Sequence, residues 1–314
     1  MFQGMEYVYE VYKAKSFSKA AKNLFISQPS LSATVKRVES KVGYPIFNRN
    51  TSPLSLTECG ERYIQSVEQI MAIQNTFTSF LNDLGGLKTG HLTLGGSSLF
   101  SSCVLPRLMG EFTQRFPQVT INLVEESTAR LEELLFAGVL DLVIDNYPFN
   151  ETVFGRRRDQ EDHLVLAVPK SFPINQKLSS YQISVKQIRS GEVLGGTVTP
   201  EPLELFKKEP FIVLKPENDT RRRGDKLCQA HGFTPKAIME LDQQMTSYNV
   251  TCSGMGISFI SDTLICHVTP HPDVVYYKLP GEEAHRNLYF YWKNGRYLSR
   301  AMDEFLAIAS KYSV

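Results

Sequence analysis

Cysteine is scarce in this 314-residue chain, and the five cysteines form no CxxC pair and are odd in number. This usage indicates reduced thiols in a cytoplasm and argues against a disulfide framework or a zinc site. No apolar run approaches the roughly 20 residues that cross a bilayer. The first residues also lack the basic and apolar parts of a secretory signal. We therefore expect a cytoplasmic protein.

The short motifs of catalysis are missing too. The histidines show no metal-ligand spacing, and there is no GxSxG elbow, Walker loop, or GxGxxG followed by an acidic residue. We therefore expect no catalytic residue, no metal, no cofactor and no enzymatic activity. Hydrophobic residues make up 42% and charged residues 21%, which is an ordinary globular composition that excludes wholesale disorder.

The net charge of +1 conceals an asymmetry along the chain. Residues 1–56 hold eight Lys or Arg against three Glu, which gives +5 and leaves −4 for the remainder. A basic head on a mildly acidic body indicates one segment that touches a polyanion and one that does not. A solvated helix face produces the same count, so charge alone does not decide between the two interpretations.

The head has the pattern of a helix-turn-helix. A short helix follows Ser18, a plausible N-cap, and a longer helix follows Ser27. Between them, Phe25 and Ile26 are too apolar for a solvated loop, so we expect a buried turn. The second helix of such a motif enters the major groove by its N-terminal end. A three-helix packing module with a solvated face would show the same pattern.

The residues of this head resemble the DNA-binding head of the LysR-type transcriptional regulators. The motifs that carry the resemblance are Phe17-Ser18-Lys19-Ala20-Ala21, Ile26-Ser27-Gln28-Pro29-Ser30-Leu31-Ser32, Phe47-Asn48-Arg49 and Leu56-Thr57-Glu58-Cys59-Gly60-Glu61. The resemblance implies a winged helix-turn-helix, with the wing from Asn48 to Ser55 and Arg49 on a phosphate. Many members carry Arg or Gln where this chain has Thr34, so their base preference is not transferred.

The candidate DNA-binding residues combine this resemblance with simple chemistry. Small hydroxyl and amide side chains can approach base edges, whereas cations are better placed for phosphates. The candidates are Ser18, Ser27, Gln28, Pro29, Ser30, Ser32, Thr34, Lys36, Arg37 and Arg49.

A linker helix is predicted for residues 57–87. Its apolar residues follow a 3.5-residue repeat, which is typical of the seam of a two-helix coiled coil. The seam consists of Tyr63, Val67, Ile70, Gln74, Phe77, Leu81 and Leu84. Thr57 is a suitable N-cap, and Gly85-Gly86 should end the helix. Packing on the chain's own body would explain the seam as well, but the family uses this helix to dimerise, and its dimers join into tetramers.

Residues 91–314 alternate strands and helices, which favours a mainly parallel sheet covered on both faces. We expect an α/β protein overall, with an all-α-rich winged helix-turn-helix head (1–56), the linker helix and a two-lobed α/β effector-binding domain (91–314). The body also resembles the family's periplasmic-binding-protein-like domain. That resemblance places lobe I at 91–162 and 268–314 and lobe II at 163–267, with Ser171 to Val198 as an insertion.

A ligand of such a body lies between the lobes, at the carboxyl ends of strands. Helix N-termini meet there and favour anions, so we expect a small anionic, carboxylate-bearing metabolite. The candidate ligand residues are Ser97, Ser98, Thr128, Asn146, Thr220 and Gln243. Ser97 and Thr220 align with positions where family members bond their effectors. Helix capping explains the same residues and does not exclude binding.

The sequence thus predicts a sequence-specific LysR-type transcriptional regulator controlled by a small metabolite. Its expected partners are promoter DNA, the effector and further copies of itself, with RNA polymerase as a candidate partner. One alternative is a stand-alone small-molecule binding protein. Another is a redox-sensing regulator using Cys228 and Cys252, although the family's peroxide sensors place their reactive cysteine near Thr220 here. The run Arg221-Arg222-Arg223 is interpreted as a solvated face unless one arginine turns inward.

Overall fold

Two units make up the chain in the computed structural model, which describes residues 1–84, 89–191 and 202–312. The first unit comprises Met1–Leu81 with Phe136–Val139, and the second comprises Asn82–Leu135 with Leu140–Val314. The predicted helix stop at Gly85-Gly86 and part of the predicted insertion lie outside the described residues. In the described ranges, no helix is both long enough and apolar enough to span a bilayer.

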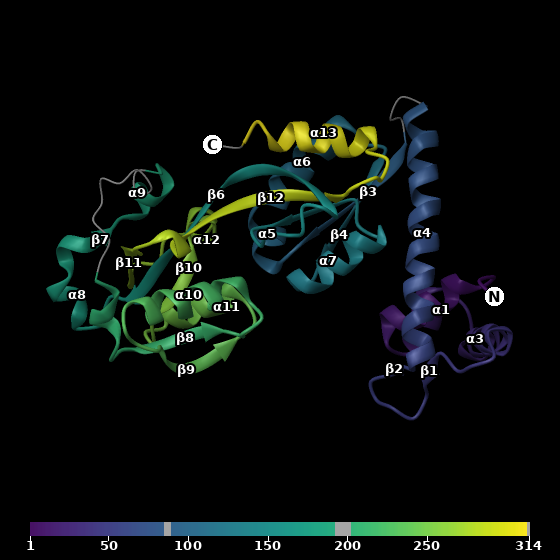
Figure 1. Ribbon diagram of the computed structural model, residues 1–314, viewed down its shortest axis with the longest axis horizontal. Coiled ribbons are helices and arrows are strands. Elements are labelled where there is room, and N and C mark those ends of the chain that lie inside the picture. The colour runs from purple at the N-terminus through teal and green to yellow at the C-terminus, as the bar shows by residue number, and fades with distance from the viewer. Residues whose placement is uncertain (85–88, 192–201, 313–314) are drawn as a thin grey trace. The chain divides into compact units, whose positions relative to one another are not determined.

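The head consists of three helices and a two-stranded antiparallel sheet (Figure 1). Its elements are α1 (Met5–Ala14), α2 (Phe17–Asn23), α3 (Gln28–Val42), β1 (Phe47–Asn48) and β2 (Ser55–Leu56). Leu31, Val35 and Val38 recur at i, i+4 and i+7 and are buried with Val8 and Val11 of α1. The helix-turn-helix with its wing is therefore present as predicted.

Capping residues set the ends of these helices. Ser27 accepts a hydrogen bond from the Ser30 N–H at 3.3 Å, which caps α3 as expected. The expectation that Ser18 caps α2 is wrong, because Ser16 has the extended backbone of an N-cap and accepts from the Lys19 N–H at 3.4 Å. Helix α2 therefore begins at Phe17, and Ser18 is a helical residue with an exposed side chain.

The turn between α2 and α3 is not buried throughout, contrary to the sequence-based expectation. Phe25 has a left-handed backbone conformation with φ of 55°, and 95% of its surface is exposed. Its neighbour Ile26 is half-buried against the core of the head. The turn thus reverses the chain with one apolar side chain inward and one outward.

Helix α4 (Glu58–Leu84) begins as predicted, because Thr57 accepts a hydrogen bond from the Gly60 N–H at 2.9 Å. The predicted seam divides into two parts. Tyr63 and Val67 are buried in the core of the head, so they serve packing within the chain. The second half of the helix instead carries an exposed apolar stripe, which consists of Ile73, Phe77, Phe80, Leu81 and Leu84.

Lobe I is a five-stranded sheet in the order β4-β3-β5-β12-β6. Its strands are β3 (Gly90–Gly96), β4 (Val119–Glu125), β5 (Leu142–Asp145), β12 (His285–Lys293) and the first half of β6 (Phe154–Pro169). Its helices are α5 (Ser98–Cys103), α6 (Leu105–Arg115), α7 (Thr128–Ala137) and α13 (Arg300–Ala309). Figure 1 shows α6 and α13 on one face of the sheet and α7 on the other.

Lobe II is built on the second half of β6, which pairs with β10 (Ser258–Ser261) and β11 (Val274–Lys278). The remaining strands are β7 (Gln182–Ile183), paired with β11, and the parallel pair β8 (Pro210–Leu214) and β9 (Lys236–Leu241). Its helices are α8 (Ile174–Lys177), α9 (Val185–Arg189), α10 (Asp219–Ala230), α11 (Gln244–Cys252) and α12 (Asp262–His267).

Two features of the sheet differ from the sequence-based expectation. The sheet is mixed rather than mainly parallel, because β12, β10 and β11 all run antiparallel to β6. Strand β11, expected in lobe I as part of 268–314, pairs with residues 165–169 of β6 and with β7. We therefore propose that the boundary between the lobes lies after β11, with β6 and β12 running from one lobe to the other.

Candidate functional site

The first site is the exposed face of α3 with its neighbours. Most of the predicted DNA-binding side chains are exposed, namely Ser18, Ser27, Gln28, Pro29, Ser30, Lys36, Arg37 and Arg49. Ser18 donates a hydrogen bond to Gln28 Oε1 at 3.1 Å, which orients Gln28 from α2. Ser32 and Thr34 are half-buried, and a Cβ placed on Gly4 would lie 3.6 Å from the Thr34 methyl group. Thr34 thus faces the N-terminal segment.

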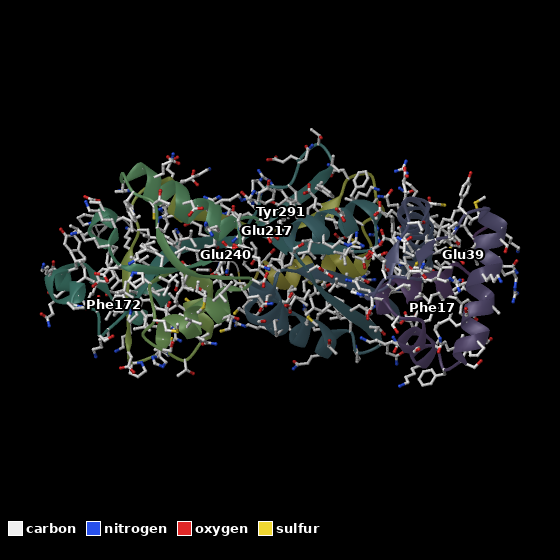
Figure 2. The ribbon with its side chains drawn as sticks, turned by 90° about the horizontal axis from the view of Figure 1, so that it is seen from below. Phe17, Glu39, Phe172, Glu217, Glu240 and Tyr291 are labelled. Carbon is white, nitrogen blue, oxygen red and sulfur yellow. The ribbon has the colours of Figure 1, made fainter. Side chains whose placement is uncertain are left out.

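Arg49 connects the wing to helix α3. Its Nη2 donates to Glu39 Oε2 at 2.8 Å, and Nη1 donates to Ser32 Oγ at 3.4 Å. The guanidinium carbon also lies 5.2 Å from the ring centroid of Phe17, which is labelled with Glu39 in Figure 2. Arg49 therefore orients the wing relative to α3, a role that the sequence did not show. Its side chain is 43% exposed, and its contact with a phosphate stays a prediction.

The second site is a cavity of about 360 Å³ between the two lobes, within the usual range for small-molecule sites. All six predicted ligand residues line it: Ser97, Ser98, Thr128, Asn146, Thr220 and Gln243. They follow the carboxyl ends of five strands, β3, β4, β5, β8 and β9, and all but Asn146 begin or precede helices α5, α7, α10 and α11. Topology therefore brings residues that are far apart in sequence to one cavity, and their contact with a ligand stays a prediction.

Hydrogen bonds already occupy some of these side chains. Thr220 Oγ1 is buried and accepts from Gln244 Nε2 at 2.7 Å and from Arg286 Nη1 at 3.0 Å. A hydroxyl that accepts twice still has its own proton to donate, so Thr220 is suited to meet a ligand acceptor. Ser97 occupies the N-cap position of α5 but makes no capping hydrogen bond in the part of the chain described. Its hydroxyl is free to bind a ligand.

A buried network at the floor of the cavity joins the lobes. Asp162 of β6 accepts from Asn146 Nδ2 at 3.3 Å in lobe I and from Thr263 Oγ1 at 2.8 Å in lobe II. It also pairs with Arg286 of β12, whose Nε donates to it at 2.7 Å. Burial raises the pKa of Asp162, but the Arg286 guanidinium and the hydrogen bonds from Ser261 and Thr263 together outweigh this and lower the pKa below its ordinary value. The network gives the two lobes a shared, charged connection.

Carboxylates are the lining residues that the sequence-based analysis missed. They are Glu125, Glu126, Asp145, Glu217, Asp219 and Asp242, whereas the cationic lining residues are Lys215 and Arg286. The missed acids stand at or just after the carboxyl ends of strands, so the same rule that found the hydroxyls would have found them. Their number goes against the expectation of an anionic ligand, which rested on helix N-termini alone.

Burial suppresses the reactivity of the cysteines proposed for a thiol switch. Cys228 is fully buried, and burial raises the pKa of its thiol to about 12. Burial also raises the pKa of the Cys252 thiol. Because the thiolate is the reactive form, both side chains are poor candidates for oxidation near neutral pH. The structure therefore disfavours this pair as a sensor.

Comparisons with known proteins cover both units. The LysR substrate binding domain matches residues 85–190 and 192–313, and the bacterial regulatory helix-turn-helix protein of the lysR family matches residues 2–61. An uncharacterized HTH-type transcriptional regulator of Bacillus subtilis strain 168, YcgK, is 27% identical over 305 residues. That alignment covers 97% of this chain and 92% of YcgK.

Solved structures show the same fold at lower identity. A full-length OxyR variant from Pseudomonas aeruginosa matches with a TM-score of 0.66 at 18% identity. The match covers 98% of this chain and 93% of the OxyR chain. Full-length CbnR in complex with its target DNA has a TM-score of 0.65 at 16% identity, covering 99% of each chain. Since the two family matches together span almost the whole sequence, this chain belongs to the LysR family and is a transcriptional regulator with an effector-binding domain, not an enzyme.

Proposed function

We propose that this regulator binds promoter DNA sequence-specifically through α3 and its wing, and that a small molecule in the cavity between the lobes controls it. The observation that carries the proposal is the convergence of Ser97 and Thr128 from lobe I with Thr220 and Gln243 from lobe II on one cavity. A ligand that contacts both lobes favours the arrangement in which it makes more contacts. It controls DNA binding only if its affinity differs between the two states.

The floor network supplies a physical route for this control. Asp162 bonds to both lobes, and its partner Arg286 reaches Thr220, which lines the cavity. A ligand that hydrogen-bonds Thr220 therefore acts on a group that is connected to the strands β6 and β12 running between the lobes. This contact couples occupancy of the cavity to the positions of the two lobes.

Self-association completes the proposal. The exposed stripe of α4 would pair with a second copy, as the family resemblance implies, and two dimers would join into a tetramer. A dimer presents two copies of α3, which suits operators made of two half-sites. RNA polymerase stays a candidate partner on the resemblance alone.

Matched lysine variants on α3 test the DNA-binding part of the proposal. Lys36 and Lys41 are both exposed on this helix, but Lys41 lies in its last turn and its Nζ donates to Gln3 Oε1 at 3.4 Å. We expect Lys36→Ala to weaken binding to all sequences alike and to reduce the slope of log affinity against log salt by about 0.9, because one phosphate contact is lost. Lys41→Ala should leave the slope unchanged.

Fluorescence anisotropy at several salt concentrations measures the DNA affinity of both variants. The DNA fragments are those recovered from cells after crosslinking to the protein. The two substitutions remove the same charge from the same helix, so any general field effect is equal. Equal losses for both variants would mean that α3 contributes only its net charge, and the assignment of its N-terminal half to the groove would fail. A protein that binds no recovered fragment would overturn the proposal.

A further inference from the structure

The charges of the cavity lining do not balance. Lys215 is paired with Asp242, with 2.6 Å between Nζ and Oδ1, and Arg286 is paired with Asp162 and Asp219. Four lining carboxylates are left with no ion pair to a cation anywhere in the described ranges: Glu125, Glu126, Asp145 and Glu217, the last labelled in Figure 2. The cavity therefore carries an excess of negative charge.

Asp145 is the member of this group that is buried, with 1% of its surface exposed. Its carboxylate accepts from the Tyr147 N–H at 2.8 Å and from Thr128 Oγ1 at 3.0 Å. Three other buried carboxylates face a cation or a histidine: Asp141 faces Arg296, Asp162 faces Arg286 and Asp262 faces His163. A buried charge without an opposite charge is costly, and a cation bound beside it reduces that cost.

The partial positive charges of helix N-termini oppose the negative charge of the carboxylates, but they are smaller. Helices α5, α7, α10 and α11 each direct an N-terminus at the cavity and contribute at most about half a positive charge apiece. The side chain of Asn218 already caps α10, and Asp219 lies in its first turn. Four partial charges of this size amount to at most about +2, against four full negative charges that no cation offsets.

The arginine run of α10 does not change this balance. Arg221 pairs with Asp225 and Glu240, and Arg223 pairs with Asp219. The guanidinium of Arg222 lies over the ring of Tyr147, 4.8 Å from its centroid. None of the three arginines lines the cavity, so no arginine of this run turns inward to receive a carboxylate ligand.

From these observations we propose that the effector of this regulator is a small organic cation, whose ammonium or guanidinium group is held by the carboxylates of the cavity. This inference rests on the proposed function, since it names the class of molecule that the cavity takes. The exposed carboxylates Glu125, Glu126 and Glu217 receive its N–H donors, and Asp145 supplies negative charge from the floor. Thr220 donates its hydroxyl proton to an acceptor elsewhere on the same molecule.

The rest of the lining narrows the class further. Among the described residues, no three His, Cys, Asp or Glu side chains lie close enough to hold a metal ion, so the carboxylates of the cavity do not form a metal site. Phe100 is the one aromatic residue of the lining described, and it is buried. A quaternary ammonium group needs several aromatic faces, whereas primary ammonium and guanidinium groups use carboxylate acceptors.

Calorimetric titration of the purified full chain with three sets of probes tests the proposal. The first set is putrescine, cadaverine and agmatine, the second is lysine and arginine, and the third is the anions succinate and benzoate. We expect the cations to bind and the anions not to bind. Binding of the second set alone would show that the ligand carries a carboxylate beside its cationic group, which still places the cation in the cavity.

Substitutions of the lining carboxylates test whether the cationic probes bind in this cavity. Asp145→Asn should weaken the affinity for the cation about 10- to 100-fold, because a charge-assisted interaction is lost. Glu217→Gln should weaken it as well. Glu151→Gln removes the same charge from lobe I at a residue outside the lining, where Glu151 pairs with Arg156, and should leave the affinity unchanged.

Each contrary outcome has a distinct meaning. Anions that bind, and lose affinity in Thr220→Val, would overturn the cation while leaving the cavity as the effector site. Cations whose affinity survives both Asp145→Asn and Glu217→Gln would bind elsewhere, and the proposal would fail. A chain to which no probe binds at millimolar concentration would overturn the cationic class, while the cavity itself is tested separately by its effect on DNA binding.

Discussion

Asp145 is a buried carboxyl whose ionised form is costly to the folded state. Burial and the nearby Asp219 carboxylate raise its pKa to about 6, although the Tyr147 N–H and Thr128 hydroxyl oppose the shift. Because the folded pKa lies above the ordinary value, the folded state holds a proton between about pH 4 and 6 that the unfolded state has lost. This group therefore destabilises the protein at neutral pH, and the penalty begins to fall as the pH drops below about 6 and is gone near pH 4.

Asp145→Asn should remove this dependence. The Asn oxygen can still accept from the Tyr147 N–H, and the amide can donate to the Thr128 hydroxyl, which can also accept. We expect the variant to be more stable than the parent at pH 7.5, by an upper bound of about 3 kcal/mol, and equal to it near pH 4. Chemical denaturation at both pH values measures the difference.

Asp162→Asn is the contrasting variant. This carboxylate is also buried, but it pairs closely with Arg286, so its removal leaves that buried cation with only the longer pair to Asp219 at 3.4 Å. We expect a loss of stability at pH 7.5, opposite in sign to the effect of Asp145→Asn. If both variants lost stability alike, the raised pKa of Asp145 would have to be rejected.

Residue chemistry also limits what the sequence reveals about the site. Hydroxyls and amides at strand ends, such as Ser97 and Thr220, could be predicted because the topological rule names those positions. The charge balance of the cavity could not be predicted, because it depends on which carboxylates form ion pairs with cations in the folded chain. Lys215 and Asp242 are far apart in the sequence but pair in space, whereas Asp145 lies beside another acid.

At the scale of elements, α4 is fixed to the head by a close backbone approach. A Cβ placed on Gly60 would lie 2.1 Å from the carbonyl oxygen of Ile46, and that oxygen accepts from the Thr57 N–H at 3.0 Å. We expect Gly60→Ala to destabilise the head by roughly 1–3 kcal/mol or more, because neither backbone segment can move freely. Scanning calorimetry of the full chain measures the change.

A second helical glycine gives the matched control. Gly110 lies within α6, and a Cβ there would meet no atom within 4 Å. Gly110→Ala should therefore stabilise by about 0.5–1 kcal/mol, since it only lowers the entropy of the unfolded chain. A Gly60→Ala variant that behaved like Gly110→Ala would show that α4 is not held against Ile46.

Element types could be predicted better than element partners. Apolar periodicity identified α3 and α4, and alternation of strands and helices identified the α/β body, because both patterns are local. Partners are set by the whole fold. Tyr63 and Val67 fit a coiled-coil seam by spacing, yet they pack into the head, and β11 pairs within lobe II although residues 268–314 were expected in lobe I. Phe25 is exposed because its left-handed backbone directs it outward.

For the whole molecule, the exposed stripe of α4 is the surface through which we propose that the regulator self-associates. Phe77 and Leu81 are 61% and 49% exposed, and they lie one turn apart with Ile73 and Leu84 on the same stripe. Large apolar side chains gathered on one helix face mark an association surface. We expect light scattering to give at least a dimer for the parent and a monomer for Phe77→Asp combined with Leu81→Asp.

Thr78→Asp serves as the control, because Thr78 is also exposed on α4 but lies outside the stripe, and it should leave the mass unchanged. Loss of the dimer should also weaken binding to a fragment with two half-sites, by about 10²- to 10⁴-fold, since the second contact is no longer intramolecular. Binding to a single half-site should be kept, which separates lost assembly from a damaged head. A double variant that retains the parent's mass would place the association surface elsewhere than on α4.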